Sequence, residues 1–214
     1  EGRFQRLELG SGRVGGDQVV DGIHQKRNKQ KNKLLLFRRK DIKMKRLPKY
    51  TPAEVRNDPY GFTYKEMSEV IGENEAKALY EELYKQLPRK KNLSMLVKNI
   101  CKSSDTEKYV YELKDNKYIE TVFIKRRDGG TVCVSTQVGC PVGCIFCESG
   151  RNGFVRNLTS SEIVQQIILL RRKVNRIVFM GMGEPLFNYD NLIKAIHILR
   201  DRYGLNFPTD GITI

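Results

Sequence analysis

Three cysteines lie close together in the second half of the chain, at Cys140, Cys144 and Cys147. Their C-x3-C-x2-C spacing puts three thiols on one short segment, in which glycine and proline favour a tightly curved backbone. Three thiolates can ligate three irons of a [4Fe–4S] cluster, which leaves the fourth iron without a protein ligand. An open metal position is where a small molecule can bind and react. The spacing therefore predicts a reactive [4Fe–4S] cluster.

Two other uses of these cysteines remain open from the residues alone. Cys133 could act as the fourth ligand of a zinc site that stabilises an RNA-binding module. A plain electron-transfer iron–sulfur protein is the other alternative. Three clustered cysteines rather than four disfavour both. Because the chain has five cysteines and no secretory signal, a disulfide scaffold is not expected.

A second motif follows the apolar run at residues 176–180 and consists of Gly181, Met182, Gly183, Glu184 and Pro185, here called the glycine-rich turn. The apolar run predicts a short buried strand of a parallel sheet. In barrel folds, the turns at the carboxyl ends of such strands line the active site. A tight strand-to-helix connection without a ligand would produce the same pattern.

The chain is strongly basic, with 39 Lys and Arg against 25 Asp and Glu and a formal net charge of +14. Residues 1–50 alone contain 15 Lys and Arg against 5 Asp and Glu. Cationic side chains neutralise phosphates, so a polyanionic partner is expected, although charge alone does not separate RNA from DNA or anionic lipid. Without a secretory signal or a run of about 18 apolar residues, we expect a cytoplasmic protein that does not span a membrane.

The apolar periodicity divides the chain into three parts. Residues 1–62 are predicted to be a basic, flexible extension. Residues 63–105 are predicted to form a small helical accessory domain, with a helix over 74–86 and another that begins at Asn92. Residues 106–214 are predicted to be the core, in which the period first changes to two.

The core is predicted to begin with three short strands and to continue as an alternation of helices and strands. The expected strands are 109–114, 118–125 and 131–137. The later elements are a helix from Ser160 or Ser161 to Arg172, a strand over 176–180, a helix over 189–203 and a strand over 211–214. This order indicates an α/β fold with a parallel sheet or partial (β/α) barrel. So few strands cannot close a barrel, so we expect the chain to be a fragment that lacks the C-terminal half.

Three segments together closely resemble one family. They are Thr131–Cys140 (TVCVSTQVGC), Gly153–Leu158 (GFVRNL) and Gly181–Leu186 (GMGEPL). The resemblance, which covers roughly residues 65–214, is to the radical-SAM RNA adenine methyltransferases. These enzymes methylate C2 of an adenine in the 23S ribosomal RNA, and C2 enzymes also act on tRNA. A related branch methylates C8, and the sequence does not separate the two.

The resemblance implies cofactors and residue roles. The cofactors are a [4Fe–4S] cluster held by the three clustered cysteines and S-adenosylmethionine, whose amino group the glycine-rich turn contacts. The family moves a methyl group onto a C-terminal Cys, transfers it by radical chemistry to the adenine, and releases the protein–RNA link by forming a disulfide. By position, Cys133 is the resolving Cys and Glu120 helps with proton handling. An electron donor such as flavodoxin or ferredoxin is the implied partner besides RNA.

Each role implied by the resemblance also has a purely structural alternative. Cys133 alone would be an inert Cys of a buried strand, and Glu120 a solvent-facing strand residue. The methyl-carrying Cys is expected beyond residue 214, and Cys101, on the helix expected from Asn92, is in the wrong place to replace it. We therefore expect this chain alone not to complete methyl transfer. Arg151, Arg156, Arg171 and Arg172 are candidates for contact with RNA phosphates.

Overall fold

The computed structural model describes residues 50–85 and 92–214. Most of the predicted basic extension, residues 1–49, lies outside the described residues. The last part of the predicted extension contains helix α2 (Pro52–Asn57) and a single 3-10 turn at Pro59–Gly61. Among the described residues, no helix is long and apolar enough to cross a membrane.

Three short helices come first in the described chain: α2, α3 (Tyr64–Ile71) and α4 (Glu73–Lys85). The first two begin with the same capping box. The Thr51 hydroxyl accepts a hydrogen bond from the Glu54 backbone, and Thr63 and Glu66 repeat the arrangement. The predicted helix over 74–86 is confirmed as α4, whose buried residues are Ala76, Tyr80 and Leu83.

A six-stranded mixed sheet follows, in the order β1-β2-β3-β4-β7-β8. Its antiparallel part consists of β1 (Met95–Lys102), β2 (Thr106–Leu113), β3 (Tyr118–Arg126) and β4 (Gly129–Cys133). Strands β7 (Arg176–Val178) and β8 (Ile212–Thr213) run parallel to β4. The expected α/β fold with parallel strands after the cysteines is therefore confirmed.

The helix predicted from Asn92 is wrong, because residues 95–102 form the edge strand β1. Asn92 followed by an apolar run resembles a helix start, but β1 pairs along its length with β2, from Met95 opposite Leu113 to Lys102 opposite Glu107. Pairing with a neighbouring strand outweighs a weak local preference. Cys101 consequently lies on an exposed edge strand and not on a helix.

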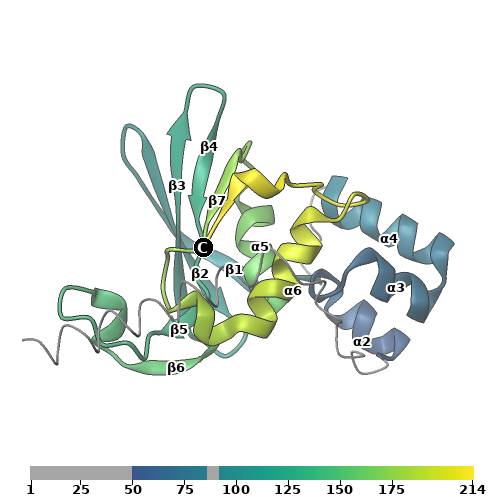
Figure 1. Ribbon diagram of the computed structural model, residues 1–214, viewed down its shortest axis with the longest axis horizontal. Helices are drawn as coiled ribbons and strands as arrows, with labels where there is room; N and C mark the ends of the chain where they lie inside the picture. The colour runs from purple at the N-terminus through teal and green to yellow at the C-terminus, as the bar shows by residue number, and fades with distance from the viewer. Residues whose placement is uncertain (1–49, 86–91) are drawn as a thin grey trace, which may run out of the picture. The chain divides into compact units, whose positions relative to one another are not determined.

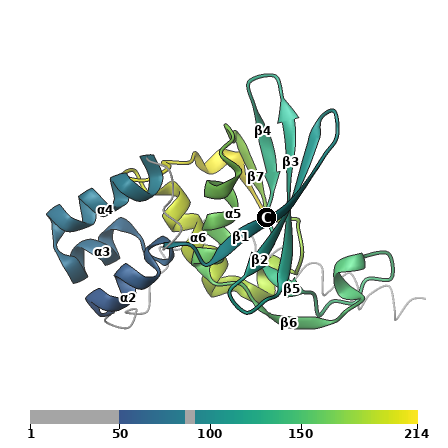
Figure 2. The same cartoon turned by 180° about the vertical axis from the view of Figure 1, so that it is seen from behind.

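Helices α5 (Ser160–Leu170) and α6 (Tyr189–Arg200) pack on one face of the sheet, between it and α2–α4 (Figure 1). Strands β2, β3 and β4 alternate buried and half-exposed residues, as expected when helices cover only one face. The covered face includes Tyr111, Ile119 and Val132, all fully buried. The opposite face points away from these helices in both views (Figures 1 and 2) and is here called the open face.

The predicted boundaries of α5 need correction. Thr159, and neither Ser160 nor Ser161, is the N-cap, and its hydroxyl accepts a hydrogen bond from the Glu162 backbone. The helix ends at Leu170 because Arg171 adopts a left-handed conformation with φ of 51°. The strand predicted over 131–137 is divided into β4 and a separate β5 (Gln137–Gly139), which pairs with β6 (Phe154–Asn157) in a two-stranded sheet.

Candidate active site

The three clustered cysteines lie on the long loop that joins β5 to β6. The Cys140 backbone donates a hydrogen bond to the Gly153 carbonyl (3.2 Å), which closes the base of the loop. A side chain at Gly139, whose φ is +73°, would collide with that carbonyl. The Cys147 backbone donates to the Cys144 carbonyl (3.0 Å), so the loop turns tightly between the last two cysteines.

The thiols of this loop are accessible. Cys144 is exposed, and Cys140 and Cys147 are half-buried. Their neighbours Ile145 and Phe146 are 100% and 90% exposed, so the tip buries almost no apolar surface of its own. Among the residues that the structure describes, no three His, Cys, Asp or Glu side chains are arranged to hold a metal ion. The loop thus contains three thiols within eight residues, all at least partly accessible.

The glycine-rich turn packs against residues 134–137, the segment that leads into the cysteine loop. The Met182 carbonyl accepts hydrogen bonds from the backbones of Thr136 (2.8 Å) and Gln137 (3.2 Å). In the other direction, the Gly181 backbone donates to the Val134 carbonyl (3.1 Å). The structure therefore joins two motifs that are 41 residues apart in the sequence, counted from Cys140 to Gly181.

Both glycines of this turn are required by the closeness of the two segments. A Cβ atom on Gly181 would lie 2.8 Å from the Ser135 nitrogen, and one on Gly183 would lie 2.5 Å from the Cβ of Gln137. Gly183 also has a φ of +98°, which side chains rarely adopt. The glycines thus bring the backbone of the turn against the segment before the cysteines.

Glu184 has a local partner in the structure. Its carboxylate accepts a hydrogen bond from the Leu186 backbone (3.2 Å) and caps the 3-10 turn at Pro185–Asn188. Its own backbone donates to the Gln137 side-chain oxygen (2.9 Å). Glu184 is half-buried, and its backbone contact is with the segment that leads to the cysteines.

Cys133 and Glu120 lie on the open face of neighbouring strands. Cys133, the last residue of β4, is opposite Val122 on β3, and Glu120 is two residues before Val122. Such diagonal neighbours are about 7–8 Å apart. Burial raises the pKa of the Cys133 thiol, against a smaller lowering by a hydrogen bond with the Met180 backbone. The Glu120 carboxylate pairs with Lys108 at 2.9 Å, and this contact raises the pKa of Lys108.

A buried hydrogen-bond network, which the sequence did not reveal, supports these segments. The Gln166 side chain, fully buried on α5, accepts hydrogen bonds from the Thr121 hydroxyl (2.7 Å) and the Ser135 backbone (2.8 Å) and donates to the Ser135 carbonyl (2.9 Å). The Ser135 hydroxyl donates to the Glu120 carbonyl and accepts from the Met182 backbone (2.9 Å). Only the apolar face of α5 was visible in the sequence, since a polar residue on a buried face has no periodic signal.

Three of the four arginines predicted as candidates for RNA contact already have carboxylate partners. Arg156 binds Glu162 through two hydrogen bonds of 2.8 Å and Asp115 through one of 2.7 Å, and these contacts raise its pKa. They attach β6 to the start of α5 and to the turn between β2 and β3. Arg172 pairs with Glu107 (3.1 Å) and Arg151 with Glu148 (3.2 Å). Arg171 is the remaining candidate.

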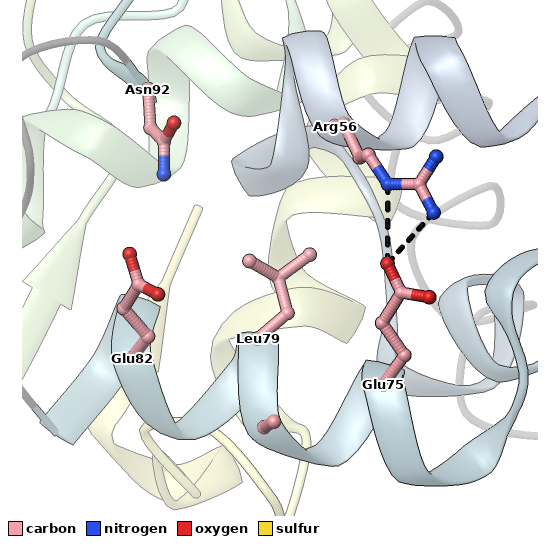
Figure 3. Close-up of a pocket in the computed structure, with 6 residues that line it drawn as sticks. Arg56, Glu75, Leu79, Glu82 and Asn92 are labelled. Atoms are coloured by element: carbon pink, nitrogen blue, oxygen red, sulfur yellow. Dashed lines mark hydrogen bonds and ion pairs between the residues drawn. The ribbon is translucent and has the colours of Figure 1, made fainter.

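A cavity of about 330 Å³ lies between α2 and α4, away from the elements that hold the cysteines. Figure 3 shows Arg56 and Glu75 paired at one side and Leu79, Glu82 and Asn92 around the remainder. None of the predicted site residues lines it. The accessible cysteine loop, and not this cavity, is therefore the candidate site.

Comparison with known proteins shows what the chain is similar to. Residues 134–214 match the radical SAM superfamily. The chain is 57% identical over 109 residues to a "Probable RNA methyltransferase" of Rhodopseudomonas palustris (strain BisB5), which covers 51% of this chain and 30% of that relative. It is 40% identical over 157 residues to a "Probable dual-specificity RNA methyltransferase RlmN" of Pseudothermotoga lettingae, which covers 72% of this chain and 44% of that relative.

A solved structure is also similar, that of a radical SAM methyltransferase from Sphaerobacter thermophilus. The TM-score is 0.67 at 31% sequence identity, over 72% of this chain and 55% of that one. Residues 134–214 therefore resemble part of a radical SAM domain, and the mixed α/β fold matches part of a radical SAM methyltransferase. The curated relatives are RNA methyltransferases by name, and the chain spans only 30% and 44% of the two described above.

Proposed function

We propose that the chain is part of an S-adenosylmethionine-dependent radical RNA methyltransferase that methylates C2 of an adenine in 23S ribosomal RNA, with tRNA as a second candidate substrate. The observation that supports this most is the contact between the glycine-rich turn and residues 134–137. It brings the turn beside the loop that contains three thiols of the right number and spacing for a cluster with an open iron.

In this proposal each predicted site residue has one task. Cys140, Cys144 and Cys147 hold a [4Fe–4S] cluster, and residues 181–185 contact the amino group of S-adenosylmethionine. When bound, these groups supply the one-electron chemistry that methylation of an unactivated aromatic carbon requires. The accessible thiols suit the ligand role, because a cluster and a substrate both have to reach the tip of the loop.

Cys133 and Glu120 are proposed to act on the open face. Cys133 would resolve the protein–RNA link by forming a disulfide, and Glu120 would accept a proton. Burial keeps the Cys133 thiol protonated at neutral pH, so it needs a base before it can act as a nucleophile. Glu120 is a half-exposed carboxylate on the same face of the adjacent strand, which is the type of group that accepts a proton.

The first test is anaerobic reconstitution of this chain with iron and sulfide, with EPR spectra recorded before and after addition of S-adenosylmethionine. We expect about four irons per chain and a signal that changes when S-adenosylmethionine is added. One zinc per chain without an iron–sulfur signal would overturn the proposal in favour of a zinc-stabilised RNA-binding module. Flavodoxin and ferredoxin are the electron donors to compare as reductants.

The position of methylation needs the full-length enzyme. After reaction with 23S ribosomal RNA fragments and with tRNA, nucleoside digests would be compared by mass spectrometry with 2-methyladenosine and 8-methyladenosine. We expect the 2-methyl product, and the 8-methyl product would assign the protein to the other branch. In the same enzyme, Cys133→Ala should trap protein covalently on RNA, and normal turnover would contradict the resolving role.

A further inference from the structure

One end of the sheet gathers basic side chains from segments that are distant in the sequence. This end, here called the cationic end, comprises residues 102–107, 125–130, 171–176 and 209–211. The Asn175 backbone donates to the Gly130 carbonyl (2.8 Å), its side chain donates to the Asp128 carbonyl (3.2 Å), and the Lys125 backbone donates to the Asp105 carbonyl (2.7 Å). These contacts hold the turns together at the end of the sheet away from β5 and β6 (Figures 1 and 2).

The cationic end has a marked excess of positive charge. It contains eight Lys and Arg against four Asp and Glu. Glu107 pairs with Arg172 (3.1 Å) and Lys125 (3.6 Å) and so neutralises part of the charge. Among the residues that the structure describes, six exposed cations here have no ion-pair or hydrogen-bond partner for their side chains: Lys102, Arg126, Arg127, Arg171, Lys173 and Arg176.

The opposite end of the sheet has no such excess. Residues 114–117, 134–157 and 181–190, here called the cysteine end, contain four Lys and Arg against four Asp and Glu. Arg156 and Arg151 there are paired with carboxylates. A phosphate chain that approaches the described residues is therefore attracted chiefly to the end away from the cysteine loop.

We propose that the cationic end binds backbone phosphates of the RNA substrate. This inference rests on the proposed function, since it assumes that the substrate is RNA. Unpaired Lys and Arg side chains are the usual partners of phosphate oxygens, and they position a nucleic acid without reading its bases. Exposed large apolar side chains, which a membrane-binding surface needs, are absent from all four segments of this end.

The location of this surface restricts the kind of RNA that can use it. Strand β4 runs between the two ends, and its five residues span roughly 16 Å. An RNA that contacts the cationic end while its target base is at the cysteine loop has to be longer than this strand. A structured RNA with a duplex stem meets this requirement, and a short oligonucleotide that contains only the target adenine does not.

The test compares two charge-matched triple variants of the full 214-residue chain. Arg126→Gln, Arg127→Gln and Lys173→Gln remove three cations from the cationic end, and Lys65→Gln, Lys77→Gln and Lys117→Gln remove three exposed cations elsewhere. The probe is a fluorescent RNA stem-loop of about 20 base pairs, longer than the roughly 16 base pairs that a double-stranded-RNA domain spans. Binding is measured by anisotropy at several salt concentrations. Residues 1–49 are the same in both variants, so their contribution cancels.

We expect the first variant to bind the stem-loop about ten-fold more weakly than the second, with a slope of log K against log salt that is smaller by about three. Equal weakening in both variants would overturn the inference, because binding would then follow net charge alone. Loss of binding to phosphatidylserine vesicles with unchanged RNA binding would also overturn it. Cluster formation with S-adenosylmethionine is measured separately, so failure of this inference is distinguishable from failure of the proposed function.

Discussion

The two ends of the sheet differ in how their polar groups are used. At the cysteine end, backbone and side-chain hydrogen bonds connect residues 134–137, the glycine-rich turn and α5, and both arginines are paired with carboxylates. At the cationic end the turns are joined by a few backbone hydrogen bonds and by the contacts of Glu107 and Asn175, and six cations remain without partners among the described residues. Paired and buried groups hold atoms in position, whereas unpaired exposed charges attract a mobile polyanion. The difference suggests separate places for chemistry and for substrate attachment.

The largest effect is expected from removal of a cluster ligand at the cysteine end. Cys144→Ala should abolish the four-iron cluster after reconstitution, because two thiols cannot hold three of its irons. Cys101→Ala is the matched control, since Cys101 is also an exposed thiol but lies on β1. Iron and sulfide counting measures both variants. Equal iron content in the two would remove the cysteine loop from the proposed site.

A side chain added in the glycine-rich turn should cost more stability than one added in the exposed cysteine loop. Gly183→Ala places a Cβ atom against Gln137 at a φ of +98° and should destabilise the fold by about 3 kcal/mol. Gly143→Ala, at a φ of +65° with no atom within 4 Å of the new Cβ, should cost only about 1–2 kcal/mol. Urea unfolding measures both. A cost for Gly143→Ala as large as that for Gly183→Ala would contradict the close-approach argument.

Removal of the buried side-chain amide of Gln166 should lower the stability of the segments that lead to the cysteine loop. Gln166→Leu leaves the Ser135 backbone groups without partners, and we expect a loss of about 2–3 kcal/mol. The control is Gln165→Leu, which removes a buried amide bonded to Ser94 and Ser161. Cluster yield should fall only in the Gln166 variant. If both variants lose stability and cluster yield alike, the network has no special role in positioning the loop.

The smallest effect is a difference in reactivity between thiols. Since burial raises the pKa of Cys133, we expect its alkylation by iodoacetamide at pH 8 to be about ten-fold slower than that of the exposed Cys144. The native state holds this proton more tightly than the unfolded chain, so the free energy of unfolding should fall as the pH rises above the ordinary thiol pKa. Peptide mass spectrometry gives each rate. Equal rates would show that Cys133 is accessible and unshifted.

Much of the fold was predictable because its signals are local. The spacing of apolar residues in the sequence predicts the alternating burial in β2 and β3 and the apolar faces of α5 and α6. The helix predicted from Asn92 was wrong for the opposite reason, because the signal that decides this segment is not local. Its strand conformation depends on pairing with β2, and no short window of sequence contains that partner.

The sequence by itself determined the chemical groups of the site: three thiols on one loop, a glycine-rich turn, and the superfamily that both indicate. Only the tertiary structure decided how these groups meet. It showed that Gly181 and Gly183 let the turn pack closely against residues 134–137 and that Gln166 is hydrogen-bonded to the Ser135 backbone. It also showed that Arg156 forms ion pairs with Glu162 and Asp115. The reason is physical: residue type and spacing fix which ligands exist, whereas burial, close approach and pairing arise between segments that only folding brings together.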